Sequence, residues 1–445
     1  MARERLSSRL GFILLSAGCA IGCGNVWKFP WMVGQNGGGA FVLVYLAFLV
    51  VLGLPALTME FALGRASQAS PVRMYQELEK PDSKWHIHGY VCLLGNIFLM
   101  AFYTVVTGWL IYYFVSFVAG KSGELSFGKM ISSPKINVGY LFIAVALCFL
   151  ILTRNLQSGL ERITKYMMVL LLVLMTVLAV RSISLPGGAK GLSFYLVPDF
   201  NKLTVPFVVG AMNQAFFTLS LGIGAMSIFG SYIGKDRSLM GESVKVIILD
   251  TFVAVTAGLI IFPACASFGI AVDAGPSLLF NTMTTVFNNM GGGRVWGSLF
   301  FLFMVFAAFS TELAVCENIL ACVREMTGWS RKKGCVICGA GIFLIALTTA
   351  LGYSVLHFHP FGEGSAWLDF WDFIVSNNLL PLGALIFAVF SCSSKFGLGW
   401  EKLVQEANEG EGLKVKNWMK PVFAYFVPLC IIAIYIIGLA TFKWK

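Results

Sequence analysis

Residues 11–30 read GFILLSAGCAIGCGNVWKFP, an apolar stretch long enough to cross a membrane but poor at forming a helix in its middle. Gly18, Gly22 and Gly24 lie close together at that point, and Pro30 closes the stretch. Each glycine disfavours a helix by about 1 kcal/mol relative to alanine. We therefore expect this helix to unwind halfway along its length.

A second stretch, residues 213–232, has the same character and reads NQAFFTLSLGIGAMSIFGSY. Here Thr218 and Ser220 precede Gly222 and Gly224. Small residues in a membrane helix can simply allow close packing, and for each stretch taken singly this alternative stays open. Two such interruptions, each opening a group of five helices, instead indicate a binding site between inverted repeats. Unwound backbone offers carbonyl groups to cations and N–H groups to anions, and it must face a protein-lined cavity.

The composition places both stretches in lipid. Of the 445 residues 58% are hydrophobic and only 12% are charged, a balance that a soluble protein of this size could not bury. The mean hydropathy is +0.80. A helix needs about 20 apolar residues to span a bilayer. We predict eleven such helices, at 10–34, 40–66, 88–119, 138–154, 163–183, 205–232, 243–271, 294–323, 335–353, 368–394 and 420–442.

The distribution of charge predicts the orientation. Most Lys and Arg residues fall in the connections on the side of the N-terminus, which predicts a cytoplasmic N-terminus and, for an odd number of spans, an outside C-terminus. We expect a multi-pass protein of the inner (plasma) membrane without a cleavable signal peptide. The formal charge of +10 reflects this topology and not a nucleic-acid-binding surface. The predicted units are 1–183 (N-terminal tail and first five helices), 184–396 (next five) and 397–445 (a cytoplasmic loop and the eleventh helix).

The reactive side chains do not form an enzyme-like set. The eleven cysteines lie mostly in apolar segments, and Cys335 and Cys338 form a lone C-x-x-C without a second pair. His357 and His359 could bind a metal ion, although a solvated outside loop is the favoured interpretation. No nucleophile–base set is recognisable, so we expect neither an enzyme nor a bound cofactor.

Four motifs carry a resemblance to a known family. They are G-x-A-I-G-x-G-N-V-W-K-F-P at 18–30, NGGGAF at 36–41, GLPALTMEFALGR at 53–65 and FFTLSLGIGAM at 216–226. Together they closely resemble the neurotransmitter:sodium symporter family, through essentially the whole chain and in its bacterial amino-acid branch. The resemblance implies an all-α polytopic membrane protein with the leucine-transporter fold, in which two inverted five-helix repeats have broken first and sixth helices.

The resemblance also implies two sodium sites. The first would use the carbonyl of Ala20 with Asn25, Thr218, Asp250 and the substrate carboxylate. The second would use the carbonyls of Gly18, Ile21 and Ala307 with the hydroxyls of Ser310 and Thr311. Alternatively, those two hydroxyls only bond back within their own helix.

Asp250 departs from the pattern of chloride-dependent relatives, which usually carry an asparagine there and a serine one turn later. Here the later position is Ala254. An aspartate inside a membrane helix is functional by default. A fixed carboxylate could supply the negative charge that chloride supplies elsewhere, so we predict chloride-independent transport. Protonation of Asp250 on the empty return step is a further hypothesis.

For the substrate, the resemblance places a carboxylate at the Tyr103 hydroxyl and the N–H groups near Cys23 and Gly24. The amine would meet the carbonyls of Ala20 and Phe217 and the hydroxyl of Ser220, and Thr218 is also counted among the substrate-binding residues. Monoamine-carrying relatives have an aspartate at the position of Gly22, so glycine predicts an amino acid. The side-chain pocket would comprise Leu99, Phe217, Ile223 and Val315, all apolar. The choice between leucine, tyrosine and tryptophan stays open.

The resemblance further implies a gate at each end. Lys28 and Asp372 would form the outer gate with Phe217 as a lid, and Asp369 is a competing partner of Lys28. Arg3 would form the inner gate with Glu325, near Tyr232, unless both are ordinary juxtamembrane charges. Glu60 and Glu317 are expected to brace the broken segments.

These expectations combine into one function: a sodium-coupled symporter that imports a hydrophobic or aromatic L-amino acid by alternating access, as a monomer or dimer. The alternatives are a non-transporting amino-acid sensor, a channel and a membrane enzyme. Sensors of this kind typically add a soluble output domain, and the longest polar stretch, roughly 395–420, reads as a loop.

Overall fold

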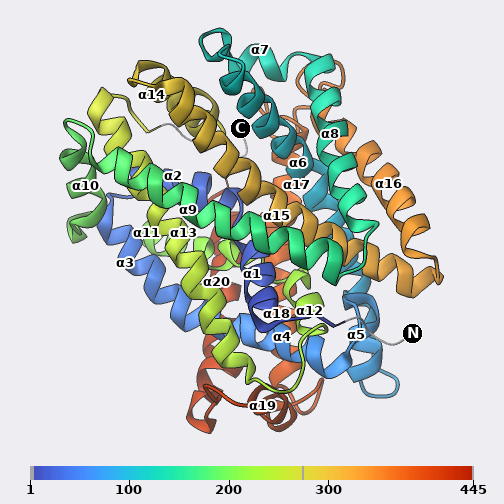
Figure 1. Cartoon of the computed structure of the whole chain (residues 1–445). Coiled ribbons are helices and arrows are strands. Elements are labelled where there is room, and N and C mark those ends of the chain that lie inside the picture. Colours follow the sequence, from blue (N-terminus) through green and yellow to red (C-terminus); the bar gives the residue numbers. More distant parts are fainter. Residues whose placement is uncertain (1–4, 273–274, 443–445) are drawn as a thin grey trace.

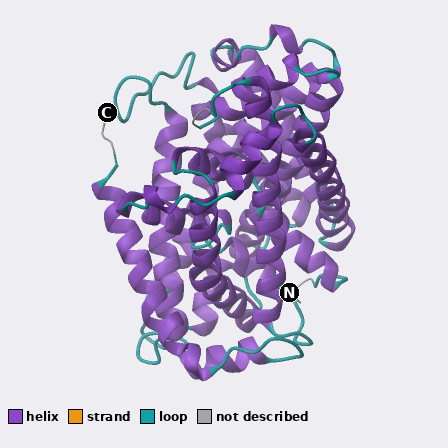
Figure 2. Ribbon diagram, turned by 90° about the vertical axis from the view of Figure 1, so that its left-hand side faces the viewer, coloured by secondary structure: helices purple, strands orange, loops and turns teal. Residues whose placement is uncertain are grey.

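The computed structural model describes residues 5–272 and 275–442. Within these ranges the chain is helical, and its only strand-like pairings are two isolated bridges, Gly38 with Pro198 and Arg237 with Glu411. Figure 1 shows the helices gathered into one bundle, and the turned view in Figure 2 shows most of them running along its long axis. The expected all-α architecture is confirmed.

The first predicted span is broken where its glycines lie. It consists of α1 (Arg9–Ala20), a π-helical turn η1 (Gly24–Lys28) and α2 (Phe29–Gln35). The two halves meet at an angle of 55°. Ile21 ends α1 with an extended backbone, so the helical hydrogen bonds stop at the cluster of glycines as expected.

The sixth predicted span is broken as well. Six residues separate the end of α11 (Val205–Thr218) from the start of α12 (Ala225–Gly230). Gly222 in this break has φ +102°, and a Cβ there would lie 2.0 Å from the carbonyl oxygen of Leu380. Only glycine fits this conformation and this approach of two backbones. Ser220 also has a positive φ, +51°, which marks local strain at the break.

The remaining spans are continuous or contain only π-helical or 3-10 turns. They are α3–η2–α4 (Gly39–Phe48, Leu49–Gly53, Leu54–Ser67), α6 (His86–Val118), α8 (Pro134–Leu152), η4–α9 (Gln157–Glu161, Arg162–Ile183), α13 (Leu239–Phe268), α15 (Gly293–Thr327), α16 (Arg331–Leu351), α17–η7–α18 (Trp367–Asp372, Phe373–Leu379, Leu380–Cys392) and η8–η9–α20 (Asn417–Met419, Val422–Phe426, Val427–Ala440). Among the described residues nine helices are long and apolar enough to cross a membrane, or ten if the bent first pair counts as one span. The broken sixth segment is too short in each piece to be counted, so the number eleven stays a prediction.

Short helices cap the two ends of the bundle. α7 (Phe127–Ile131) and α14 (Thr284–Asn289) lie at the top of Figure 1, whereas α19 (Trp400–Asn408) lies at the bottom, with α5 (Pro71–Leu78) toward that end. α10 (Gly188–Leu196) packs against α13. This grouping agrees with the sides on which the predicted topology places these connections.

The centre of the bundle is formed by α6 and α15. In each of these two helices, 78% of the most apolar 18-residue stretch is buried inside the protein. In the last span, residues 417–440, the buried share of that stretch is only 28%. α1 packs against α15, α13 and α9. The broken helices are therefore held in the protein interior, where unwound backbone meets side chains instead of lipid.

Two buried acids brace this interior as expected. Glu60 of α4 accepts a hydrogen bond from the backbone N–H of Gly222 at 2.6 Å and so supports the second break. Glu317 of α15 forms a buried ion pair with Arg331 of α16 at 2.5 Å. Glu317 also accepts a hydrogen bond from the Tyr232 hydroxyl, just beyond α12, at 3.2 Å. Both acids thus act within the scaffold.

Candidate functional site

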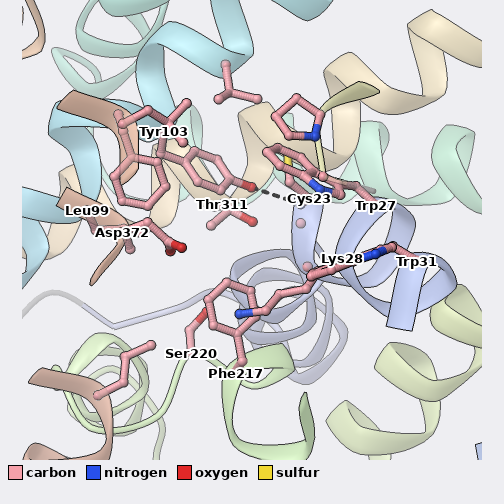
Figure 3. A pocket seen from close by; sticks show the side chains of 18 of the residues that line it. Cys23, Trp27, Lys28, Trp31, Leu99, Tyr103, Phe217, Ser220, Thr311 and Asp372 are labelled. Atoms are coloured by element: carbon pink, nitrogen blue, oxygen red, sulfur yellow. Dashed lines mark hydrogen bonds between the residues drawn. The ribbon is translucent and has the colours of Figure 1, made fainter. Parts of the chain in front are cut away.

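A cavity of about 270 Å³ lies beside the two breaks, and Figure 3 shows its side chains. The first break, α6, the second break and α17 all contribute to its wall. The predicted substrate residues that line it are Ala20, Cys23, Gly24, Leu99, Tyr103, Phe217, Ser220 and Ile223. Thr218 and Val315 do not line it: the Thr218 hydroxyl bonds to Asp250, and Val315 is fully buried elsewhere on α15.

One end of the cavity is polar. The Tyr103 hydroxyl accepts a hydrogen bond from the backbone N–H of Cys23 at 3.2 Å, where η1 begins. Gly22 leaves the space that this contact needs, because a Cβ there would lie 2.4 Å from the Tyr103 hydroxyl oxygen and 2.8 Å from Thr311 Oγ1. A helix start with an adjacent hydroxyl is an arrangement that suits a carboxylate.

Apart from the charged residues at the predicted outer gate, most of the remaining wall is apolar and includes Trp27, Leu99, Phe102, Val106, Ile223 and Leu380. The position of Ile223 is fixed by Asn96 of α6, whose amide donates to the Ile223 carbonyl at 2.8 Å. Asn96 was not among the predicted site residues. The wall suits a hydrophobic side chain attached to a charged head.

The predicted second sodium site is assembled from α1 and α15. Ser310 Oγ lies 3.0 Å from the carbonyl oxygens of both Gly18 and Ala307. Thr311 Oγ1 lies 3.1 Å from the Gly18 carbonyl oxygen and 3.2 Å from that of Ile21. Thr311 Oγ1 also lies 3.5 Å from the Ala307 carbonyl oxygen, so both hydroxyls are within reach of a carbonyl in α15 as well as of α1. We call these five groups the second cage.

The predicted first sodium site brings three of its members together. Asn25 Nδ2 donates to Asp250 Oδ1 at 2.8 Å, and the Thr218 hydroxyl donates to Asp250 Oδ2 at 3.1 Å. Asp250 is fully buried and has no ion-pair partner among the described residues. The fourth predicted member, the carbonyl of Ala20, lies on the cavity wall nearby.

The predicted outer gate pair is not formed in this structure. Lys28 places its Nζ 3.6 Å from the centre of the Phe217 ring, a cation–π contact. Asp372 instead accepts a hydrogen bond from Ser376 at 2.6 Å, and Asp369 accepts one from the backbone N–H of Ala366 at 2.8 Å. The cavity is lined by all three charged residues, Lys28, Asp369 and Asp372. Lys28 and Asp372 face the cavity without pairing across it.

The predicted inner gate is only partly visible. Arg3 lies outside the described residues. Glu325 accepts hydrogen bonds from the Ser70 hydroxyl at 2.6 Å and the Ser70 backbone N–H at 3.0 Å, at the start of α5. Tyr232 bonds to Glu317 instead of to Glu325. Glu325 therefore contacts the short helix α5 in this structure.

Besides Asn96, sequence reasoning missed two further residues near the site. Glu312 follows Thr311 directly and is fully buried in α15, yet it was not singled out as an acid within a span. The rule that an ionisable residue in a membrane helix is functional by default would have found it. Gln214 of α11 donates to the carbonyl oxygen of Gly24 at 3.1 Å and so joins the two broken helices. No local pattern marks that contact.

The fold and the cavity together indicate a class: a helical membrane transporter with a cavity beside two broken helices. Comparison with known proteins gives the family. The model of the sodium:neurotransmitter symporter family matches residues 3–129 and 131–445. The chain belongs to that family, and it is accordingly a sodium-coupled, multi-pass membrane transporter of a small molecule and not an enzyme.

Individual relatives agree. An uncharacterized sodium-dependent transporter of Bacillus subtilis, YhdH, is 34% identical, and the match covers 98% of each chain. An uncharacterized sodium-dependent transporter of Haemophilus influenzae is 32% identical, again over 98% of each chain. The crystal structure of MhsT in complex with L-phenylalanine matches with a TM-score of 0.87 at 33% identity, over 98% of this chain and 99% of that one.

Proposed function

We propose that this protein is a sodium-coupled symporter that imports a hydrophobic or aromatic L-amino acid, together with two sodium ions and without chloride, by alternating access. We place it in the inner (plasma) membrane with a cytoplasmic N-terminus and an outside C-terminus. The two groups of five helices opened by the broken segments would be its inverted repeats.

The observation that carries this proposal is the composition of the second cage. Three carbonyl oxygens, from Gly18, Ile21 and Ala307, surround two hydroxyls. Each hydroxyl has one proton to donate but two lone pairs to offer. The cage therefore holds more acceptors than protons in a buried place, and a hard cation such as sodium would satisfy all five oxygens at once.

The substrate class follows from the two ends of the cavity. The Cys23 N–H and the Tyr103 hydroxyl suit a carboxylate, and the wall formed by Leu99, Phe102 and Ile223 suits an apolar side chain. Residue 22 is a glycine, so the protein has no carboxylate of its own at this position to compete with the carboxylate of the substrate. MhsT, the similar solved transporter, holds L-phenylalanine, and this supports the same class for the present chain.

Asp250 supports transport without chloride. Its carboxylate is held by Asn25 and Thr218, two of the proposed sodium ligands, so a fixed negative charge already stands beside that ion. Ala254, one turn later, provides no hydroxyl for a chloride ion. The net charge of the loaded site would be balanced by the protein itself.

The driving force is sufficient for accumulation. Each charge that crosses about 100 mV gains roughly 2.3 kcal/mol. Two sodium ions with a zwitterion gain about 4.6 kcal/mol, which corresponds to more than about a thousandfold concentration before the sodium gradient is added.

Uptake into proteoliposomes tests the proposal. Labelled leucine, phenylalanine, tyrosine and tryptophan are offered under an inward sodium gradient, with chloride or gluconate as the anion and potassium replacing sodium as the control. We expect accumulation only with sodium and equal rates with either anion. Binding without accumulation would support the sensor instead, and a steep chloride dependence would overturn the role of Asp250.

A further inference from the structure

The half-helix α1 lies against α9 along a face of small residues. Gly11 and Gly18 are seven residues apart and therefore lie on the same side of α1. A Cβ on Gly11 would lie 2.0 Å from Oε1 of Glu161, and one on Gly18 would lie 3.2 Å from Thr164 Cγ2 and 3.3 Å from Met168 Sδ. This contact, which we call the α1–α9 seam, runs from Glu161 to the second cage.

Glu161 lies at the end of the α1–α9 seam where α1 begins. Its Oε2 accepts a hydrogen bond from the backbone N–H of Ser7 at 2.8 Å. Its Oε1 accepts from the hydroxyls of Ser7 at 2.7 Å and of Ser8 at 3.0 Å. The Ser8 hydroxyl in turn accepts from the backbone N–H of Gly11 at 3.0 Å, so one connected network joins the carboxylate to the first turn of α1.

This contact is electrostatic as well as geometric. Glu161 is only 3% exposed, and no Lys or Arg forms an ion pair with it among the described residues. Its charge is met by the N-terminus of α1, which carries the positive end of the helix dipole. Bonds to a buried carboxylate are stronger and less screened than bonds at the surface.

A second tether of α1 is more exposed. Arg9 pairs with Glu242 of α13 at 2.7 Å, but the Arg9 side chain is 41% exposed and Glu242 also bonds to Lys245 at 3.0 Å. Such a partly solvated, shared pair contributes less than an isolated buried one. Of the two carboxylates that contact the start of α1, Glu161 therefore makes the less solvated contact.

We propose that Glu161 is the latch that holds α1 closed at the cytoplasmic end, and that its release is the step that opens the second cage to the cytoplasm. Moving α1 from α9 breaks the three bonds to Glu161 and uncovers Thr164, whose buried hydroxyl has no hydrogen-bond partner in the described structure. Glu161 acts through α1 and is a positioning residue, not a ligand. The inference rests on the proposed alternating access and deepens it.

Hydrogen–deuterium exchange of the full-length protein in detergent or nanodiscs tests the latch. The α1 peptide is followed in sodium and in potassium for the wild type, Glu161→Ala, Glu161→Gln and Ser7→Ala. Arg162→Ala is the matched control, because Arg162 is the exposed neighbour of Glu161 in the same turn. In the wild type we expect α1 to exchange faster in potassium than in sodium, since sodium in the second cage would hold α1 in place.

Glu161→Ala should exchange in α1 at least about tenfold faster than the wild type in sodium and should lose the difference between the two ions, because more than one charge-assisted bond is removed. Ser7→Ala and Glu161→Gln should lie between, and Arg162→Ala should match the wild type. If Glu161→Ala does not fold, the two milder variants decide. Unchanged α1 exchange in them, or equal acceleration in α8 and α16, would overturn the latch.

The readout needs neither substrate nor transport. If wild-type proteoliposomes fail to accumulate any amino acid, the proposed function fails whatever α1 does. If the wild type accumulates substrate while the Glu161 and Ser7 variants exchange normally, only the latch fails. The two failures are therefore distinguishable.

Discussion

Replacing Gly22 with alanine is the smallest change that should disable the site. Gly22 lies in the first break, between Tyr103 on α6 and Thr311 on α15. A single added methyl group would touch both hydroxyls at once. One of them faces the proposed substrate carboxylate, and the other belongs to the second cage.

The magnitude follows from the contact distances. The added Cβ would lie 2.4 Å from the Tyr103 oxygen and 2.8 Å from the Thr311 oxygen, whereas ordinary contacts of a Cβ begin at 3.4 Å. The Tyr103 hydroxyl must therefore retreat by about 1 Å, which breaks its 3.2 Å bond from the Cys23 N–H. If the Tyr103 hydroxyl loses one bond, at about 0.5–1.5 kcal/mol, substrate binding weakens by roughly 2- to 12-fold, and a similar loss at Thr311 weakens sodium binding by a similar factor.

Equilibrium binding of labelled substrate in saturating sodium measures this loss, and a sodium titration at fixed substrate measures the effect on the cage. Gly341→Ala is the matched control, because Gly341 lies in a helix, α16, and a Cβ there meets nothing within 4 Å. We expect weaker binding of both ligands in Gly22→Ala and no loss in the control. Wild-type affinity for both in Gly22→Ala would refute the placement of the site between these two hydroxyls.

Three further changes test other parts of the structure. Asp250→Asn should weaken sodium binding by about tenfold or more, because one charge at about 4 Å contributes up to about 4 kcal/mol at an effective dielectric constant of 20, and a sodium titration of substrate binding reads it. Arg331→Leu should lower the free energy of unfolding by about 3–5 kcal/mol, since it leaves Glu317 buried without its 2.5 Å partner. In thermal unfolding, the double variant Arg331→Leu with Glu317→Leu should lose far less stability than the single variant. Gly222→Ala should destabilise the protein by more than about 2 kcal/mol, because φ +102° and the Leu380 carbonyl at 2.0 Å both exclude a Cβ; an unchanged melting temperature would contradict this.

The breaks in the first and sixth spans could be predicted from the residues themselves. Glycine weakens a helix through its own backbone freedom, so a cluster such as Gly18, Gly22 and Gly24 marks the break without any knowledge of neighbours. Apolar length likewise located the long spans, such as α6 and α15, because burial in lipid is a property of composition.

The partners at each break could not be predicted from local pattern. Ser310 and Thr311 lie almost three hundred residues from the α1 carbonyl that they contact, and only the resemblance to a family linked them. The contact of Lys28 with Phe217 depends on where a flexible cation finds its lowest energy, whereas the resemblance had implied Asp372 as its partner. Long-range pairing is set by the packing of whole helices, which single-residue preferences do not encode.

Side chains hold part of the first break in this structure. The Ser310 hydroxyl donates to the carbonyl of Gly18, the Thr311 hydroxyl donates to that of Ile21, and the N–H of Cys23 donates to Tyr103. Binding therefore exchanges one set of partners for another, and it does not have to create the break. Because the hydroxyls of Tyr103 and Thr311 both lie within 3 Å of the same Cβ position on Gly22, a sodium ion that reorients one hydroxyl acts directly beside the other. Coupling between ion and substrate would then require only a local rearrangement at this residue.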